Sequence, residues 1–204
     1  MWGGVPRAEA EWRTGGWSAG VRAWRGWRNC LAPSRAREVG FPPMATARPG
    51  LEKITADNVL DACRLEVAPE QRRFVSPVAQ SLAEAYVHPD LAWPRLICDG
   101  ERAVGFVMAY FDLAFDFDAG VPDAPKRSGL WRLAVAAGEQ GRGYGRFAVG
   151  AVNEEIRRRG GTVSTVTWKP GEGGPEEFYL RLGYRKRGLT DDGEYLGDMD
   201  LTAA

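Results

Sequence analysis

The residues best suited to chemistry by type and spacing run from Gln140 to Gly145 and read Gln-Gly-Arg-Gly-Tyr-Gly. Gly141, Gly143 and Gly145 alternate with larger side chains, and glycine permits positive φ angles and close approach of backbone N–H groups to a ligand. An amphipathic helix is expected directly after them, with its free N–H groups and dipole directed back at the turn. The turn therefore predicts a binding site for a phosphate or pyrophosphate.

Two common phosphate-binding motifs do not fit this turn. The dinucleotide fingerprint needs G-x-G-x-x-G and an acidic residue at the end of the next strand, whereas that strand ends in Trp168-Lys169-Pro170. The P-loop needs a Gly-Lys-Ser or Gly-Lys-Thr run, and none follows the turn. A plain strand-to-helix turn, with glycine used only for tightness, is the alternative without a ligand.

The surrounding sequence predicts the elements that position the turn. Leu133 and Val135 alternate in a strand before it, and Gly160-Gly161 ends the helix after it. The other expected elements are a strand at 51–54, helices at 56–66 and 76–86, a hairpin of 95–98 with 103–111, a strand at 162–168, a helix at 175–182 and a hairpin of 184–188 with 195–201. This order predicts an α/β (α+β) domain with a mixed sheet.

Composition limits the classes of function. The 204 residues carry 27 basic and 27 acidic side chains, so no nucleic acid or other highly charged partner is predicted. The three cysteines have no CxxC spacing and there is one histidine, so no metal site is predicted and a mechanism with two histidines is excluded. No apolar run approaches the roughly 20 residues of a membrane span. We expect a reduced, cytoplasmic location.

Residues 1–43 differ from the rest of the chain. They hold five of the eight tryptophans and seven arginines, with three acids, no lysine and no periodicity. We expect a disordered N-terminal extension, with Met44 as a candidate for the true start and the folded domain over residues 44–204. An organelle transit peptide or an RNA-binding arm are the alternatives, and a secretory signal is disfavoured because no continuous apolar centre is present.

The turn and its context resemble the GNAT superfamily of acetyl-CoA-dependent N-acyltransferases. Gln140 to Gly145 matches the turn pattern (Arg/Gln)-x-x-Gly-x-(Gly/Ala), and the later stretch Tyr179-Leu-Arg-Leu-Gly-Tyr184 resembles the pattern Tyr-x-x-x-Gly-(Phe/Tyr). The resemblance covers residues 48–201. It implies a single domain with a mixed, mostly antiparallel sheet of roughly six to seven strands and about four flanking helices.

A closer resemblance is to the bacterial spermine/spermidine (diamine) acetyltransferase-like branch. It rests on residues 67–75, 81–85, 130–133 and 168–175, the last leading into Phe178-Tyr179. The chain departs from that branch at Val78 and Glu172, where asparagine is expected. The reaction implied is transfer of acetyl from acetyl-CoA to a primary amine such as spermidine. It would proceed by direct attack in a ternary complex.

The resemblance also implies the site residues. The turn holds the pyrophosphate, with Arg142 or Arg146 adding charge, and the preceding strand offers main-chain groups to the pantetheine arm and the thioester. Tyr179 is the expected general acid for the departing thiolate, and Glu84 is expected at the amine site. The cofactor-binding set is Leu133, Ala134, Val135, Gln140, Gly141, Arg142, Gly143, Tyr144, Gly145, Arg146 and Glu172.

Several alternatives stay open. The alternative to an acid role for Tyr179 is simple packing in the last helix. Trp131 either forms a wall of the acceptor slot or packs in the core. The acceptor could instead be an antibiotic amine, an amino acid or a protein lysine, and a non-catalytic acyl-CoA sensor would share the scaffold. The expected partners are a small-molecule amine and a second copy in a homodimer, with no nucleic acid or membrane. The candidate proton acceptors are Glu66, Glu70, Glu84, Asp112, Asp116, Asp118 and Glu172.

Overall fold

The computed structural model describes residues 48–114 and 126–202, in which seven strands form one sheet in the order β1-β2-β3-β4-β5-β7-β6. Neighbouring strands are antiparallel except for β4 and β5, which are parallel. The mixed, mostly antiparallel fold is therefore confirmed. The strands are β1 (Gly50–Lys53), β2 (Ala92–Asp99), β3 (Arg102–Leu113), β4 (Arg127–Val135), β5 (Val163–Trp168), β6 (Arg185–Leu189) and β7 (Tyr195–Asp200).

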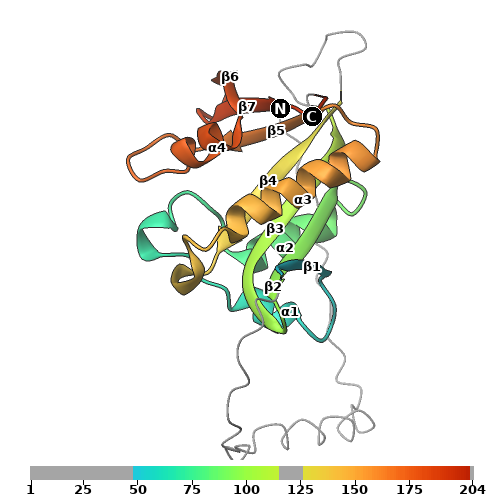
Figure 1. Ribbon diagram of the computed structural model, residues 1–204, viewed down its shortest axis with the longest axis vertical. Helices are drawn as coiled ribbons and strands as arrows, with labels where there is room; N and C mark the ends of the chain where they lie inside the picture. The colour runs from blue at the N-terminus through green and yellow to red at the C-terminus, as the bar shows by residue number, and fades with distance from the viewer. Residues whose placement is uncertain (1–47, 115–125, 203–204) are drawn as a thin grey trace, which may run out of the picture. The chain divides into compact units, whose positions relative to one another are not determined.

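Helices cover both faces of the sheet (Figure 1). The described residues form α1 (Val59–Cys63), α2 (Val78–Val87), α3 (Tyr144–Arg158) and α4 (Glu176–Leu182). On one face, α3 packs its buried side chains, including Val152 and Ile156, against β3, β4 and β5. On the other face, α1 and α2 bury Ala62, Val78 and Ala85 against β2 and β3. The sheet thus separates two apolar layers, as its alternating side chains require.

Strand β2 begins earlier than the predicted strand at 95–98, because Trp93 and Pro94 also lie inside it. Pro94 pairs with Met108 of β3, while the neighbouring strand β1 extends only to the pair Lys53–Arg95. Pro94 therefore lies where one edge of β2 is open, which is the position in a sheet that tolerates the missing N–H of proline.

Helix α1 is shorter than the predicted helix over residues 56–66. After Cys63 the chain leaves the helix, and the Glu66 carbonyl accepts a hydrogen bond from the N–H of Ala137 at 2.9 Å. Ala137 begins a short 3₁₀ turn (Ala137–Glu139) after β4, and a second one (Pro69–Gln71) follows Glu66. Neither turn was predicted, and together they bring residues 66–75 beside the end of β4.

No helix in the described ranges has the length and apolar character needed to cross a bilayer. The predicted extension at residues 1–43 lies outside the described residues, as do Asp116 and Asp118.

Candidate functional site

The central feature is the divergence of β4 and β5. The two parallel strands pair only from Ser128–Leu130 to Ser164–Val166, and beyond these residues they separate (Figure 1). Close pairing at the junction requires Gly129, because a Cβ there would lie 1.8 Å from the Thr165 carbonyl oxygen. A cavity of about 580 Å³ occupies the divergence, lined by β4, the turn before α3, the end of β5, and α4.

The turn that opens α3 presents backbone donors to this cavity. Gly141 and Gly143 have φ angles of 77° and 89°, which place them in the left-handed region that favours glycine. Gly143 is the N-cap of α3 and no side chain caps the helix. No described residue accepts a hydrogen bond from the N–H groups of residues 141–146. Unpaired N–H groups at the positive end of a helix dipole fit a phosphate or pyrophosphate.

Gly145 differs from the prediction in its backbone conformation. It does not have a positive φ angle but lies in the first turn of α3, where a Cβ would meet the Phe178 ring at 3.1 Å. The helix also begins earlier than expected, at Tyr144. The third glycine therefore permits close packing of α3 against α4.

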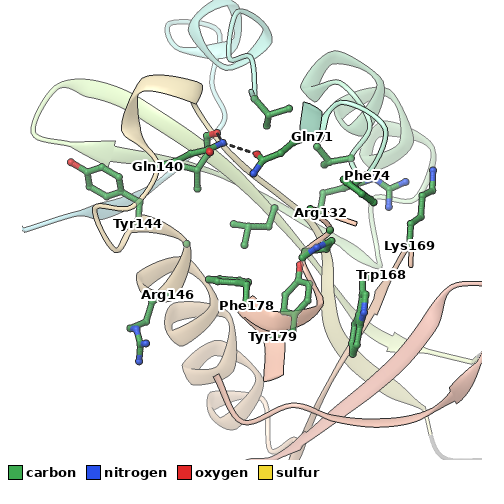
Figure 2. Close-up of a pocket in the computed structure, with 18 of the residues that line it drawn as sticks. Gln71, Phe74, Arg132, Gln140, Tyr144, Arg146, Trp168, Lys169, Phe178 and Tyr179 are labelled. Atoms are coloured by element: carbon green, nitrogen blue, oxygen red, sulfur yellow. Dashed lines mark hydrogen bonds between the residues drawn. The ribbon is translucent and has the colours of Figure 1, made fainter. Parts of the chain in front are cut away.

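The polar side chains of the turn bind protein groups. The Gln140 amide donates to Oε1 of Gln71 at 2.6 Å and to the carbonyl of Val135 at 3.3 Å (Figure 2). The Tyr144 hydroxyl donates to Asp99 at 2.6 Å, and this bond lowers the pKa of the Asp99 carboxyl. Both side chains therefore hold the turn in place, and the backbone supplies the groups available to a ligand.

Two arginines of the turn differ in their placement. Arg142 lies outside the cavity lining and pairs with Glu139 at 3.1 Å, and Glu139 also binds Arg102. Arg146 lines the cavity and forms no ion pair with a described residue. Of the two arginines, Arg146 is therefore the one free to add charge beside a phosphate.

The edge of β4 that faces the divergence is open. Leu133 and Val135 line the cavity, while the Ala134 side chain is buried against the α1 and α2 layer. A bulge at Trp131 shifts the register between β4 and β3, and the open edge follows it. Main-chain groups on this edge have no strand partner in the described part of the chain. An extended ligand can therefore pair with β4 as an added strand.

Tyr179 lies across the cavity from β4, on α4. Its ring packs against Trp168 and Phe178, with ring centroids 5.4 and 5.2 Å away, and its hydroxyl points into the cavity (Figure 2). The hydroxyl makes no hydrogen bond with a described residue. Burial, together with Tyr184 and Glu194, raises the pKa of Tyr179 above its ordinary value, so the hydroxyl keeps its proton at neutral pH.

The segment after the Pro69–Gln71 turn closes one side of the cavity. Phe74 contacts the loop after β5, where a Cβ at Gly171 or Gly174 would meet its ring at 3.2 Å. Arg73 donates to the carbonyl of Glu172 at 2.6 Å, and the Glu172 side chain does not line the cavity. Residues 71–74 therefore connect the β4 side of the divergence to the β5 side.

The acids predicted from sequence lie away from the cavity. Glu84 pairs with Arg132 of β4 at 3.0 Å, and it is Arg132 that lines the cavity. Trp131 also lines it, 6.0 Å from the His88 ring. The other described candidates, Glu66, Glu70 and Asp112, are exposed and outside the lining. No group of three His, Cys, Asp or Glu side chains in residues 48–114 and 126–202 is placed to hold a metal.

Glu194 is the acid that sequence reasoning missed. It lies in the hairpin between β6 and β7, lines the cavity, and is close enough to Tyr179 to raise its pKa. Lys169, directly after β5, also lines the cavity. The antiparallel pairing of β5 and β7 places the two residues at neighbouring positions. Glu194 belongs to no motif in the sequence, and Lys169 lies in the stretch 168–179 but had no role assigned to it.

Comparisons with known proteins agree with this geometry. A model of the acetyltransferase (GNAT) family matches residues 54–184, and no curated protein matches the chain by sequence. Among solved structures, an acetyltransferase from Thermus thermophilus is 18% identical with a TM-score of 0.54, over 78% of this chain and 100% of that one. The ribosomal-protein-S18-alanine N-acetyltransferase of Escherichia coli is 14% identical with a TM-score of 0.53, over 77% and 96%.

A third structure, the aminoglycoside acetyltransferase AAC(6')-Ib in complex with coenzyme A, is 17% identical with a TM-score of 0.60, over 75% of this chain and 95% of that one. These likenesses establish the fold. The superfamily part of the sequence resemblance is confirmed, and its narrower diamine branch stays a prediction. Since the family model spans more than half of the sequence, the chain belongs to the acetyltransferase (GNAT) family of N-acetyltransferases.

Proposed function

We propose that the cavity binds acetyl-CoA and that the protein transfers the acetyl group to a primary amine by direct attack in a ternary complex. One observation carries the proposal. The unpaired N–H groups of the α3 turn, the open edge of β4 and the hydroxyl of Tyr179 converge on the same cavity. Acetyl-CoA has a matching feature for each group: its pyrophosphate for the N–H groups, its extended pantetheine arm for the edge of β4, and its thioester sulfur for the Tyr179 hydroxyl.

The residues divide the binding task along the cavity. The N–H groups of residues 141–146 hold the pyrophosphate, with Arg146 beside them. The open edge from Leu133 to Val135 pairs with the pantetheine arm. Acetyl-CoA supplies an acetyl group already activated as a thioester, so the chain needs no covalent nucleophile of its own.

Tyr179 and Glu194 carry out the two proton transfers of the reaction. The amine nitrogen forms a bond to the thioester carbonyl carbon, the carbon–sulfur bond breaks, and the sulfur leaves with the bonding electrons. Tyr179 gives the departing thiolate a proton, which its raised pKa keeps available. Glu194 attracts the protonated amine and accepts its proton, directly or through water, and it takes the place of Glu84 in this role.

A polyamine such as spermidine is the acceptor that the diamine-branch resemblance implies, and it stays within this proposal as a candidate. Glu84, which was expected to attract it, is held by Arg132. Support for a cationic acceptor therefore comes from Glu194, which has no cationic partner in the described ranges.

The test measures acetyl-CoA turnover with a panel of amines that includes spermidine. The release of free CoA thiol is the readout. The expected result is thiol release that depends on both acetyl-CoA and an amine. Folded protein that binds CoA but releases no thiol with any amine would favour the non-catalytic acyl-CoA sensor instead.

A further inference from the structure

The charged side chains that line the cavity fall into two groups, apart from Arg181 of α4, which pairs with Glu177 at 3.0 Å. Glu139 and Arg146 lie at the phosphate end, where Glu139 is already paired with two arginines. Arg132, Lys169 and Glu194 belong to the end with Tyr179. Figure 2 shows Arg132 and Lys169 across the cavity from the turn that opens α3. The second group is therefore positioned for the acetyl acceptor.

Lys169 and Glu194 are neighbours beyond the ends of two paired strands. The last pair of β5 and β7 joins Trp168 to Tyr195, and Lys169 and Glu194 are the next residues on the two strands. Neither forms an ion pair or a side-chain hydrogen bond with a described residue. The acceptor end therefore holds one cation and one carboxylate, neither of which is in an ion pair with a described residue.

Arg132 adds a partly buried cation to this end. Its Nη2 donates to Glu84 at 3.0 Å and its Nη1 to the Trp131 carbonyl at 3.0 Å. Its Nε is buried and has no hydrogen-bond partner in the described part of the chain. The Nε is out of reach of a ligand, and the ion pair with Glu84 compensates part of the charge, but Nη1 and Nη2 each carry a second N–H. A guanidinium with such donors in a cavity wall can bind an anionic ligand, and its fork geometry suits a carboxylate.

These charges do not suit a second ammonium group. A diamine would place one ammonium beside Glu194 and the other toward Arg132 and Lys169, where like charges repel. An amine that carries a carboxylate in the same small molecule matches all three side chains. Its ammonium would lie beside Glu194, and its carboxylate would meet the two cations.

We propose that the acetyl acceptor is an amino acid, bound through its carboxylate by Arg132 and Lys169 with Glu194 facing its amine. This inference rests on the acetyl-transfer function proposed above. The carboxylate requirement distinguishes the acceptor from the polyamine implied by the sequence resemblance.

The experiment compares acceptors that differ only in the carboxylate. The pairs are alanine with ethylamine, lysine with cadaverine, and 4-aminobutyrate with propylamine, each assayed by thiol release from acetyl-CoA. In the pair with the fastest turnover, we expect kcat/KM of the amino acid to exceed that of its decarboxylated partner by about tenfold or more. Equal values, or a preference for the decarboxylated amine, would overturn the inference.

A charge reversal at Lys169 gives a second readout. Lys169→Glu should reduce the preference for the carboxylate by about tenfold or more and leave the KM for acetyl-CoA unchanged. The matched control is Lys53→Glu, the same change at an exposed lysine on β1, which should leave the preference intact. If Lys169→Glu instead raises the KM for acetyl-CoA equally with all acceptors, Lys169 belongs to the cofactor site and the inference fails. Absence of turnover with every acceptor would contradict the acetyl-transfer function itself.

Discussion

Replacement of Tyr179 by phenylalanine separates chemistry from packing, because it removes one hydroxyl and keeps the ring. The ring contacts with Trp168, Phe178 and Tyr184, at centroid distances of 5.4, 5.2 and 5.8 Å, all survive the change. The hydroxyl has no hydrogen-bond partner among the described residues, so its removal leaves no donor or acceptor unsatisfied. We therefore expect the free energy of unfolding to change by less than about 1 kcal/mol.

The expected loss of activity is much larger. A positioned general acid contributes about 10²–10⁴-fold to a rate, which corresponds to roughly 3–5 kcal/mol of activation free energy. The assay is thiol release at saturating acetyl-CoA and amine, with the Kd for CoA measured in parallel. We expect kcat to fall by about 10²-fold or more. The Kd for CoA should stay within about twofold, because the turn proposed to bind the phosphates is untouched.

Tyr184→Phe is the matched control, since it removes the same atom from a neighbouring tyrosine. The Tyr184 hydroxyl is hydrogen-bonded to Ser164 at 2.8 Å and to Asn153 at 3.4 Å. Its loss leaves the fully buried Ser164 without this partner, so we expect destabilisation of about 1–3 kcal/mol with kcat retained. Wild-type kcat in Tyr179→Phe, or parallel losses of activity and stability in both variants, would refute the acid role.

Three further predictions follow from the backbone and the protonation state. Gly143→Ala should destabilise the protein by about 1–2 kcal/mol in chemical unfolding, because alanine is strained at its φ of 89°. Gly138→Ala, in the neighbouring 3₁₀ turn but without a positive φ or a nearby atom, should be neutral or slightly stabilising. An equal loss of stability in both variants would contradict the strain argument. Gly129→Ala should separate β4 from β5, because its Cβ would overlap the Thr165 carbonyl; a wild-type Tm would show that the close pairing is wrong. Finally, kcat/KM should rise with pH as the amine loses its proton. At any pH under about 10 it should show no decrease, because the raised pKa keeps Tyr179 protonated. A decrease in kcat/KM between about pH 7 and 9 would exclude Tyr179 as the acid.

The geometry of the turn that is proposed to bind phosphate could be predicted from the sequence because it is local. A strand, a glycine-rich turn and a helix are consecutive in the chain, so their spacing predicts how the N–H groups of residues 141–146 are presented. The finer details depended on contacts with distant segments. Gln140 binds Gln71, and Gly145 is required by Phe178, and neither partner is near the turn in sequence.

The acceptor half could not be predicted in the same way. Glu194 and Lys169 take neighbouring positions only because β7 pairs with β5. The sequence contains many other acids that are equally good candidates for the proton acceptor. Glu84 was expected at the amine site, but α2 places it against Arg132, with which it forms an ion pair at 3.0 Å. The position of such charged residues depends on the sheet order, which sequence periodicity does not specify.

The most direct test of the central claim is product analysis after incubation of the purified protein with acetyl-CoA and the matched acceptors, by mass spectrometry and thiol quantification together. The cavity between β4 and β5 predicts one equivalent of N-acetylated acceptor for each equivalent of CoA released, with the amino acids preferred over their decarboxylated partners. Bound CoA with no acetylated product from any acceptor would contradict a catalytic function for this cavity.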